Sequence, residues 1–228
     1  MADVTSSSKT PIEIPQSIVE YTASFAEPVI QLGDPRAATT MTILRALKPW
    51  GFTLAGLETR LRSEKANDHA FVFKRTNPAR PAHSFALFYD KVFVSAENLD
   101  WESAETTVSA MSAGIDAVKQ STNASIAAQQ LVAGIHIQLK GKTALEVMKP
   151  LLSSSAVGLL AENLKFPGVI VTGETSNVII EASVVYANAL WVRLYRDHKA
   201  DVTLQQMAAA LRQDEERLFD VLDLEGPL

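Results

Sequence analysis

The string Gly141-Lys142-Thr143 is the part of this sequence that comes nearest to a phosphate-binding loop. It follows an apolar alternating segment and opens a helical pattern, which is where such a loop places its lysine and its hydroxyl group. The loop also needs an earlier glycine, but His136 occupies that position and residues 137–140 contain no glycine. We therefore interpret the string as a turn followed by a capping box between Thr143 and Glu146, and we predict no cofactor.

The histidines do not have the spacing of a metal site. No two of them are separated by the two or four residues that would direct both rings at one metal ion, so no metal ligands are predicted. His69 and His83 lie in polar stretches, where we expect them to be solvated, and His198 ends a strand-like segment. His136 lies in an apolar strand-like segment, where a hydrogen-bonded or solvent-facing structural role is favoured over acid–base catalysis.

The carboxylates and serines form no complete catalytic pattern. Residues 214–216 are three consecutive acids with Arg212 and Arg217 nearby, which is typical of a solvated helix face. The sequence has no Gly-x-Ser-x-Gly elbow for a nucleophilic serine. An enzyme stays an alternative only if its site is assembled from scattered polar residues such as His136, Glu174, Glu181 and Arg193.

Two positively charged segments are candidates for binding a ligand or partner. Residues 60–91 contain seven Lys or Arg against three acids, interleaved with four phenylalanines, although alternating Phe is more typical of a strand facing its core. In the second segment, large side chains alternate on one strand face, where they could stack on a ligand or clamp an anion. The candidate binding residues are Trp191, Arg193, Tyr195, Arg196, Lys74, Arg75 and Arg80.

Composition limits the classes of protein further. The 228 residues are 47% hydrophobic and 21% charged, and no apolar run is long enough to span a bilayer. Cysteine is absent, which excludes disulfides, thiolate metal sites and cysteine nucleophiles and is compatible with a cytoplasmic location. A net charge of −5 makes nucleic acid an unlikely partner. Residues 1–10 resemble no export signal and are expected to form a disordered tail.

The clearest element is a helix over 101–118, in which six apolar residues recur at spacings of three and four after Asp100 as the N-cap. Residues 126–139 alternate as a strand. Further strands are predicted over 18–32 with an interruption at Pro28, and over 52–61, 70–75, 84–96, 169–172 and 178–195, with turns near 89–91 and 187–188. Further helices are predicted after Asp34-Pro35, Thr143, Ser155 and Thr203.

This order of elements predicts an α+β fold in which helices pack on one face of an antiparallel sheet. Two similar β-α-β-β-α halves are possible within a single domain over 11–228, with a boundary near residue 122. The leading functional hypothesis is a non-enzymatic interaction or assembly protein that forms a homo-oligomer or binds another protein, anchored by Trp191, Arg193 and Tyr195. The alternative is a small-ligand or nucleic-acid binding module that uses this face together with the Lys74–Arg80 loop.

Overall fold

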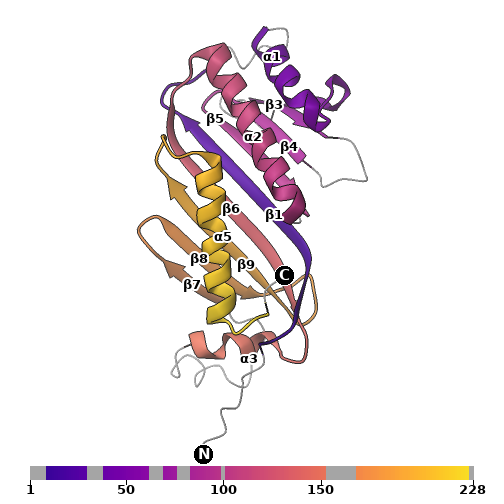
Figure 1. Cartoon of the computed structure of the whole chain (residues 1–228), viewed down its shortest axis with the longest axis vertical. Helices are drawn as coiled ribbons and strands as arrows, with labels where there is room; N and C mark the ends of the chain where they lie inside the picture. The colour runs from indigo at the N-terminus through magenta and orange to yellow at the C-terminus, as the bar shows by residue number, and fades with distance from the viewer. Residues whose placement is uncertain are drawn as a thin grey trace, which may run out of the picture. The chain divides into compact units, whose positions relative to one another are not determined.

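The protein folds as an antiparallel sheet with helices, in agreement with the predicted α+β class (Figure 1). The computed structural model describes residues 9–29, 38–61, 69–75, 83–98, 101–152 and 168–225. The strands are β1 (Ile12–Phe25), β2 (Leu57–Leu61), β3 (His69–Lys74), β4 (His83–Phe88), β5 (Lys91–Glu97), β6 (Ile126–Leu139), β7 (Gly168–Thr172), β8 (Ser176–Ala182) and β9 (Ala189–His198). The helices are α1 (Ala38–Leu47), α2 (Trp101–Thr122), α3 (Ala144–Met148) and α5 (Leu204–Val221), with short 3-10 turns η2 (Lys48–Trp50), η3 (Leu54–Gly56) and η5 (Lys149–Leu151).

Within the described ranges the strand order is β2-β3-β4-β5-β1-β6-β9-β8-β7. The two long strands β1 and β6 lie side by side: β1 is followed outward by β5, β4, β3 and β2, and β6 is followed outward by β9, β8 and β7. The pairs β3–β4 and β7–β8 are antiparallel, with the registers Phe73↔Phe85 and Ile170↔Ile179. The two sides differ in their number of strands, so the two similar β-α-β-β-α halves and the boundary near residue 122 both stay predictions.

The chain forms two compact units that are interleaved in sequence. The first, called here the β2–β5 unit, comprises Ile18–Ala133 and Tyr195–Ala210. The second, called here the β7–β8 unit, comprises Met1–Ser17, Gly134–Leu194 and Leu211–Leu228. The long strands β1 and β6, the strand β9 and the helix α5 each contribute residues to both units.

In the β2–β5 unit, alternate strand residues and the apolar stripe of α2 form the core. Gly114 lets α2 approach α1 and the sheet closely, because a Cβ atom there would lie 2.5 Å from the Phe85 ring and 2.9 Å from Leu47. The core residues with almost no exposure include Tyr21, Ile43, Leu47, Phe71, Phe73, Phe85, Leu87, Val92, Val94, Met111 and Val118.

In the β7–β8 unit, the core is built by alternate residues of β6, β8 and β9 together with α3 and the C-terminal half of α5. Its buried side chains include Ile137, Leu139, Met148, Ile180, Leu190, Val192, Leu194, Leu218 and Phe219. The predicted capping box is present: Thr143 Oγ1 accepts from the Glu146 amide, and Glu146 Oε2 accepts from the Thr143 amide. Asn188, with a φ of 54°, fixes the adjoining turn by donating to the carbonyl oxygens of Leu139 and Lys142.

The structure confirms most of the predicted elements. Strand β6 has the predicted bounds, α2 contains the predicted helix and continues to Thr122, and residues 89–90 form the predicted turn between β4 and β5. Strand β1 begins earlier than predicted, at Ile12, and it ends at Phe25, ahead of the interruption predicted at Pro28. The predicted caps at Asp34-Pro35, Asp100 and Ser155 lie outside the described residues. Among the described helices, none combines the length and apolar character needed to cross a bilayer.

Candidate functional site

Strand β9 presents the predicted row of large side chains. Leu190, Val192 and Leu194 are buried, whereas Trp191, Arg193 and Tyr195 are half-buried on the opposite face of the strand. Arg196 is also half-buried. Trp191 and Arg193 belong to the β7–β8 unit, whereas Tyr195 and Arg196 belong to the β2–β5 unit.

Trp191 packs in a cluster with His136 and Tyr186. The ring centroids of His136 and Trp191 lie 4.3 Å apart with the planes tilted by 32°, and Tyr186 meets the imidazole edge to face at 4.9 Å. His136 is only 8% exposed, and this burial lowers the pKa of its imidazole. The structural, hydrogen-bonded role predicted for His136 therefore agrees with its surroundings.

A serine hydroxyl completes this cluster. Ser183 Oγ lies 3.1 Å from His136 Nδ1 and accepts hydrogen bonds from the backbone amides of Val185 at 3.2 Å and Tyr186 at 3.1 Å. Since both oxygen lone pairs are engaged, the hydroxyl proton is the one directed at Nδ1, which places the ring proton on Nε2. A Ser–His contact is also the beginning of a nucleophilic site. Here, however, the serine oxygen is occupied in holding the turn between β8 and β9.

The other residues proposed for a scattered catalytic site do not join His136. Glu174 is exposed in the turn between β7 and β8, and Glu181 is exposed on β8. Within the described part of the chain, neither carboxylate makes a hydrogen bond or ion pair with the imidazole. No group of three His, Cys, Asp or Glu among the described residues is arranged to hold a metal ion.

The basic segment of the β2–β5 unit is engaged in local contacts. Lys74 forms an ion pair with Glu58 at 2.8 Å, and Arg75 Nη1 donates to the Trp50 carbonyl at 3.5 Å. Arg80 lies outside the described residues. Three of the four phenylalanines in this segment, Phe71, Phe73 and Phe85, are core residues, so they offer no stacking surface for bases. The core interpretation of the alternating phenylalanines is therefore confirmed for these three.

Strand β7 is an apolar edge that the sequence analysis did not single out as a site. It is the last strand in the sheet order of the described residues, and it reads Gly-Val-Ile-Val-Thr without a charge. Its side chains Ile170 and Val171 point to opposite faces and are 69% and 55% exposed. In the same unit, Val184 and Val185 are exposed in the turn between β8 and β9. The combination of β-branched residues without charge was visible in the sequence, but its exposure was not.

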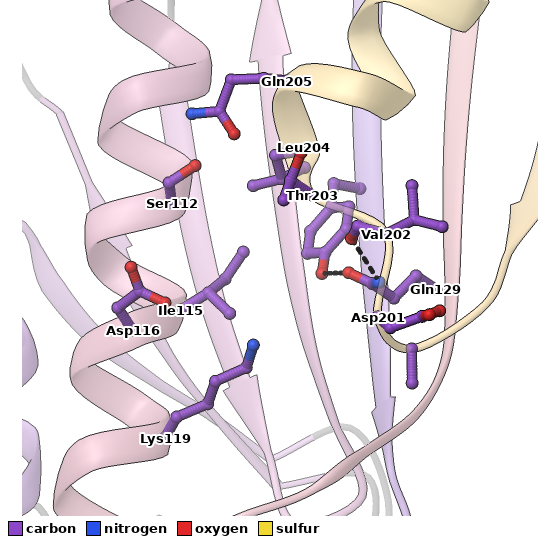
Figure 2. Close-up of a pocket in the computed structure, with 12 residues that line it drawn as sticks. Ser112, Ile115, Asp116, Lys119, Gln129, Asp201, Val202, Thr203, Leu204 and Gln205 are labelled. Carbon is purple, nitrogen blue, oxygen red and sulfur yellow. Dashed lines mark hydrogen bonds between the residues drawn. The ribbon is translucent and has the colours of Figure 1, made fainter.

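A pocket of about 320 Å³ lies in the β2–β5 unit (Figure 2). At its base, Tyr21 Oη donates to Gln129 Oε1 at 2.6 Å. Gln129 Nε2 donates in turn to the carbonyl oxygens of Lys199 at 2.8 Å and Val202 at 3.0 Å. This buried network ties the turn between β9 and α5 to strands β1 and β6. Sequence reasoning missed it because Tyr21 and Gln129 lie 108 residues apart.

Two titratable residues are less exposed than the sequence analysis predicted. His83 was expected to be solvated, but it is 7% exposed and lies 3.0 Å from Thr107 Oγ1 on α2. Glu215 was expected on a solvated helix face, but it falls between Leu211 and Leu218 on the buried stripe of α5. Burial raises the pKa of Glu215 to about 7, opposed in part by the charge of Arg212.

A comparison of the chain with protein-family models found no match, and a comparison with curated proteins found none either. The functional argument therefore depends on the residues and geometry described above.

Proposed function

We propose that this protein is a non-enzymatic interaction protein that self-associates by pairing its edge strand β7 with β7 of a second copy. The observation that carries the proposal is the uncharged, apolar and exposed character of this edge. A free strand edge offers a row of backbone donors and acceptors to another strand, and proteins that remain monomeric usually protect such an edge with charge, proline or a bulge.

The opposite edge of the sheet makes the contrast clear. Strand β2 carries Glu58, which is held in an ion pair with Lys74. Charges on an edge strand discourage pairing with another chain. Strand β7 has no such protection within its own residues, because Val169, Ile170 and Val171 occupy its centre.

A second copy is the occupant that fits this edge best. Two identical strands can pair antiparallel about a two-fold axis, so that one patch serves both sides of the interface. Burial of Ile170 and Val171 on each copy supplies the apolar contribution, and Val184 and Val185 are further exposed apolar residues of the same unit. We place this assembly in the cytoplasm, supported by the absence of cysteine.

The experiment is the particle mass in solution, measured by sedimentation over a range of protein concentrations. We expect the wild-type chain to be larger than its 24.8 kDa monomer and the Ile170→Lys and Val171→Lys variants to shift toward the monomer. Their melting temperatures should change little because both side chains are already exposed. The matched control is Val221→Lys on α5, since Val221 is 65% exposed but lies outside this surface.

Two results would contradict the proposal. One is a wild-type particle that is monomeric at about 100 μM, a concentration at which even a weak micromolar dimer is mostly associated. The other is a shift toward monomer in the joint Trp191→Ala and Tyr195→Ala variant, with the fold retained, while the β7 variants stay associated. That outcome would move the interface to the face of β9 that the sequence predicted.

A further inference from the structure

The pocket in the β2–β5 unit has two walls of different kinds (Figure 2). Helix α2 forms one wall with Ser112, Asp116 and Lys119, which recur at the spacing of one helix face. The turn after β9 and the first residues of α5 form the other wall, which includes Thr203 and Gln205. Polar groups from segments far apart in sequence therefore converge on one hollow.

The base of the pocket is fixed before any ligand arrives. The bonds from Tyr21 to Gln129, and from Gln129 to the carbonyl oxygens of residues 199 and 202, use buried groups whose geometry is set by the strands. The capping box of Thr203 and Gln206 holds the first turn of α5 in place. A preformed site loses less conformational entropy when it binds a small molecule.

The two opposite charges on the α2 wall are not satisfied by each other. In the described part of the chain, the side chains of Asp116 and Lys119 take part in no hydrogen bond or ion pair. Lys9, by contrast, forms an ion pair with Asp220 at 2.6 Å. The charge of Asp116 also reaches the base of the pocket, because it adds to the effect of burial in raising the pKa of the Tyr21 phenol.

We propose that this pocket binds a free α-amino acid with an apolar side chain, whose ammonium group meets Asp116 and whose carboxylate meets Lys119. Side chains three residues apart on a helix have Cβ atoms about 5–6 Å apart. Asp116 and Lys119 can therefore reach an ammonium and a carboxylate that are both attached to the α-carbon of one ligand. A ligand with only one charge would face a like charge from one of these residues. Ile115 and Leu204 line the same pocket and offer apolar contact to the ligand's side chain.

The size of the pocket is consistent with this class of ligand. A volume of about 320 Å³ lies at the small end of the range for small-molecule sites, which extends from about 300 to 1,000 Å³. The ammonium protons and carboxylate lone pairs that Asp116 and Lys119 leave unused can bond to the Ser112 hydroxyl and the Gln205 amide, both of which line the pocket. Asp201 also lines it, but in Figure 2 its carboxylate is directed away from α2.

The experiment is a titration of the full chain with L-leucine, followed by calorimetry and by ligand-observed NMR. Two analogues separate the charges: 4-methylpentanoate lacks the ammonium group, and 3-methylbutylamine lacks the carboxylate. We expect L-leucine to bind at least about tenfold more tightly than either analogue. Asp116→Asn and Lys119→Gln should each weaken leucine binding by at least about tenfold, whereas Glu105→Gln, an exposed change on α2 outside the pocket, should not.

Three results would overturn the inference: no leucine binding at about 10 mM ligand, equal binding of an analogue, or an equal loss in the Glu105→Gln control. The outcome is separable from that of the proposed self-association, because all the pocket residues belong to the β2–β5 unit and the β7 surface belongs to the other unit. The Ile170→Lys variant should therefore bind leucine as the wild-type chain does.

Discussion

Replacing Glu215 with Gln should stabilise the protein above neutral pH. Glu215 occupies the buried stripe of α5, and burial raises its pKa from the ordinary value of 4.5 to about 7. Well below pH 4.5 the carboxyl is protonated in both the folded and unfolded chains, so it makes no difference to stability there. Between these values the folded chain keeps the proton that the unfolded chain has lost, so the free energy of unfolding falls as pH rises.

The magnitude follows from the size of the change in pKa. A rise from 4.5 to about 7 corresponds to about 3 kcal/mol at pH 8, since each tenfold change in proton affinity is worth about 1.4 kcal/mol. Because Glu215 keeps some contact with water, we expect a gain of about 1–3 kcal/mol for Glu215→Gln at pH 8. At pH 4.5 the gain should be close to zero.

The assay is urea unfolding of the wild-type chain and the variant at several pH values, with the slope against denaturant checked for constancy. Glu105→Gln, which changes an exposed carboxylate on α2, is the control and should leave the pH dependence unaltered. The reasoning is refuted if the wild-type chain and Glu215→Gln lose stability in parallel as pH rises, or if the variant is the less stable protein at pH 8.

Three further predictions concern stability and can be measured by thermal or urea unfolding. Thr143→Ala should lower the free energy of unfolding by about 1 kcal/mol because it removes a helix cap. Lys142→Ala should change it by less than about 0.5 kcal/mol, since the 3.5 Å contact between Lys142 and Asp223 is exposed. Equal effects of the two substitutions would contradict the capping interpretation. Met111→Asp should cost about 3–5 kcal/mol by placing a charge in the core, and an unchanged melt would mean that the α2 stripe is exposed. Tyr21→Phe should cost about 1–3 kcal/mol because it leaves Gln129 Oε1 without its donor, and a neutral result would show that water replaces the phenol.

Sequence periodicity predicted the elements whose apolar residues recur at a regular spacing. Helix α2 and strand β6 were predicted closely because each has one apolar stripe or one alternating run long enough to identify, although residues 131–137 of β6 are buried on both faces. The caps at Thr143 and Thr203 were predicted because the bonded groups lie three residues apart. In such cases the information that determines the structure is local.

The candidate sites depend on contacts between residues that are far apart in the sequence. The exposure of β7 follows from its place at the end of the sheet order, which no short segment encodes. The expectation for His83 was wrong because its environment is set by Thr107 on a distant helix and not by its polar neighbours in sequence. Glu215 was predicted on the solvated face because its neighbours in sequence are acidic. Its spacing of four residues from Leu211 and three from Leu218 instead places it on the buried stripe of α5.

Hydrogen exchange at strand β7 tests the proposed assembly most directly. If β7 pairs with β7 of a second copy, the amides of Gly168–Thr172 that face away from β8 will exchange slowly at high protein concentration and quickly on dilution. The amides of the other edge strand, β2, will exchange at a rate that does not depend on concentration. An exchange rate at β7 that is the same at all concentrations, or one that slows only at β2, would contradict self-association through this edge.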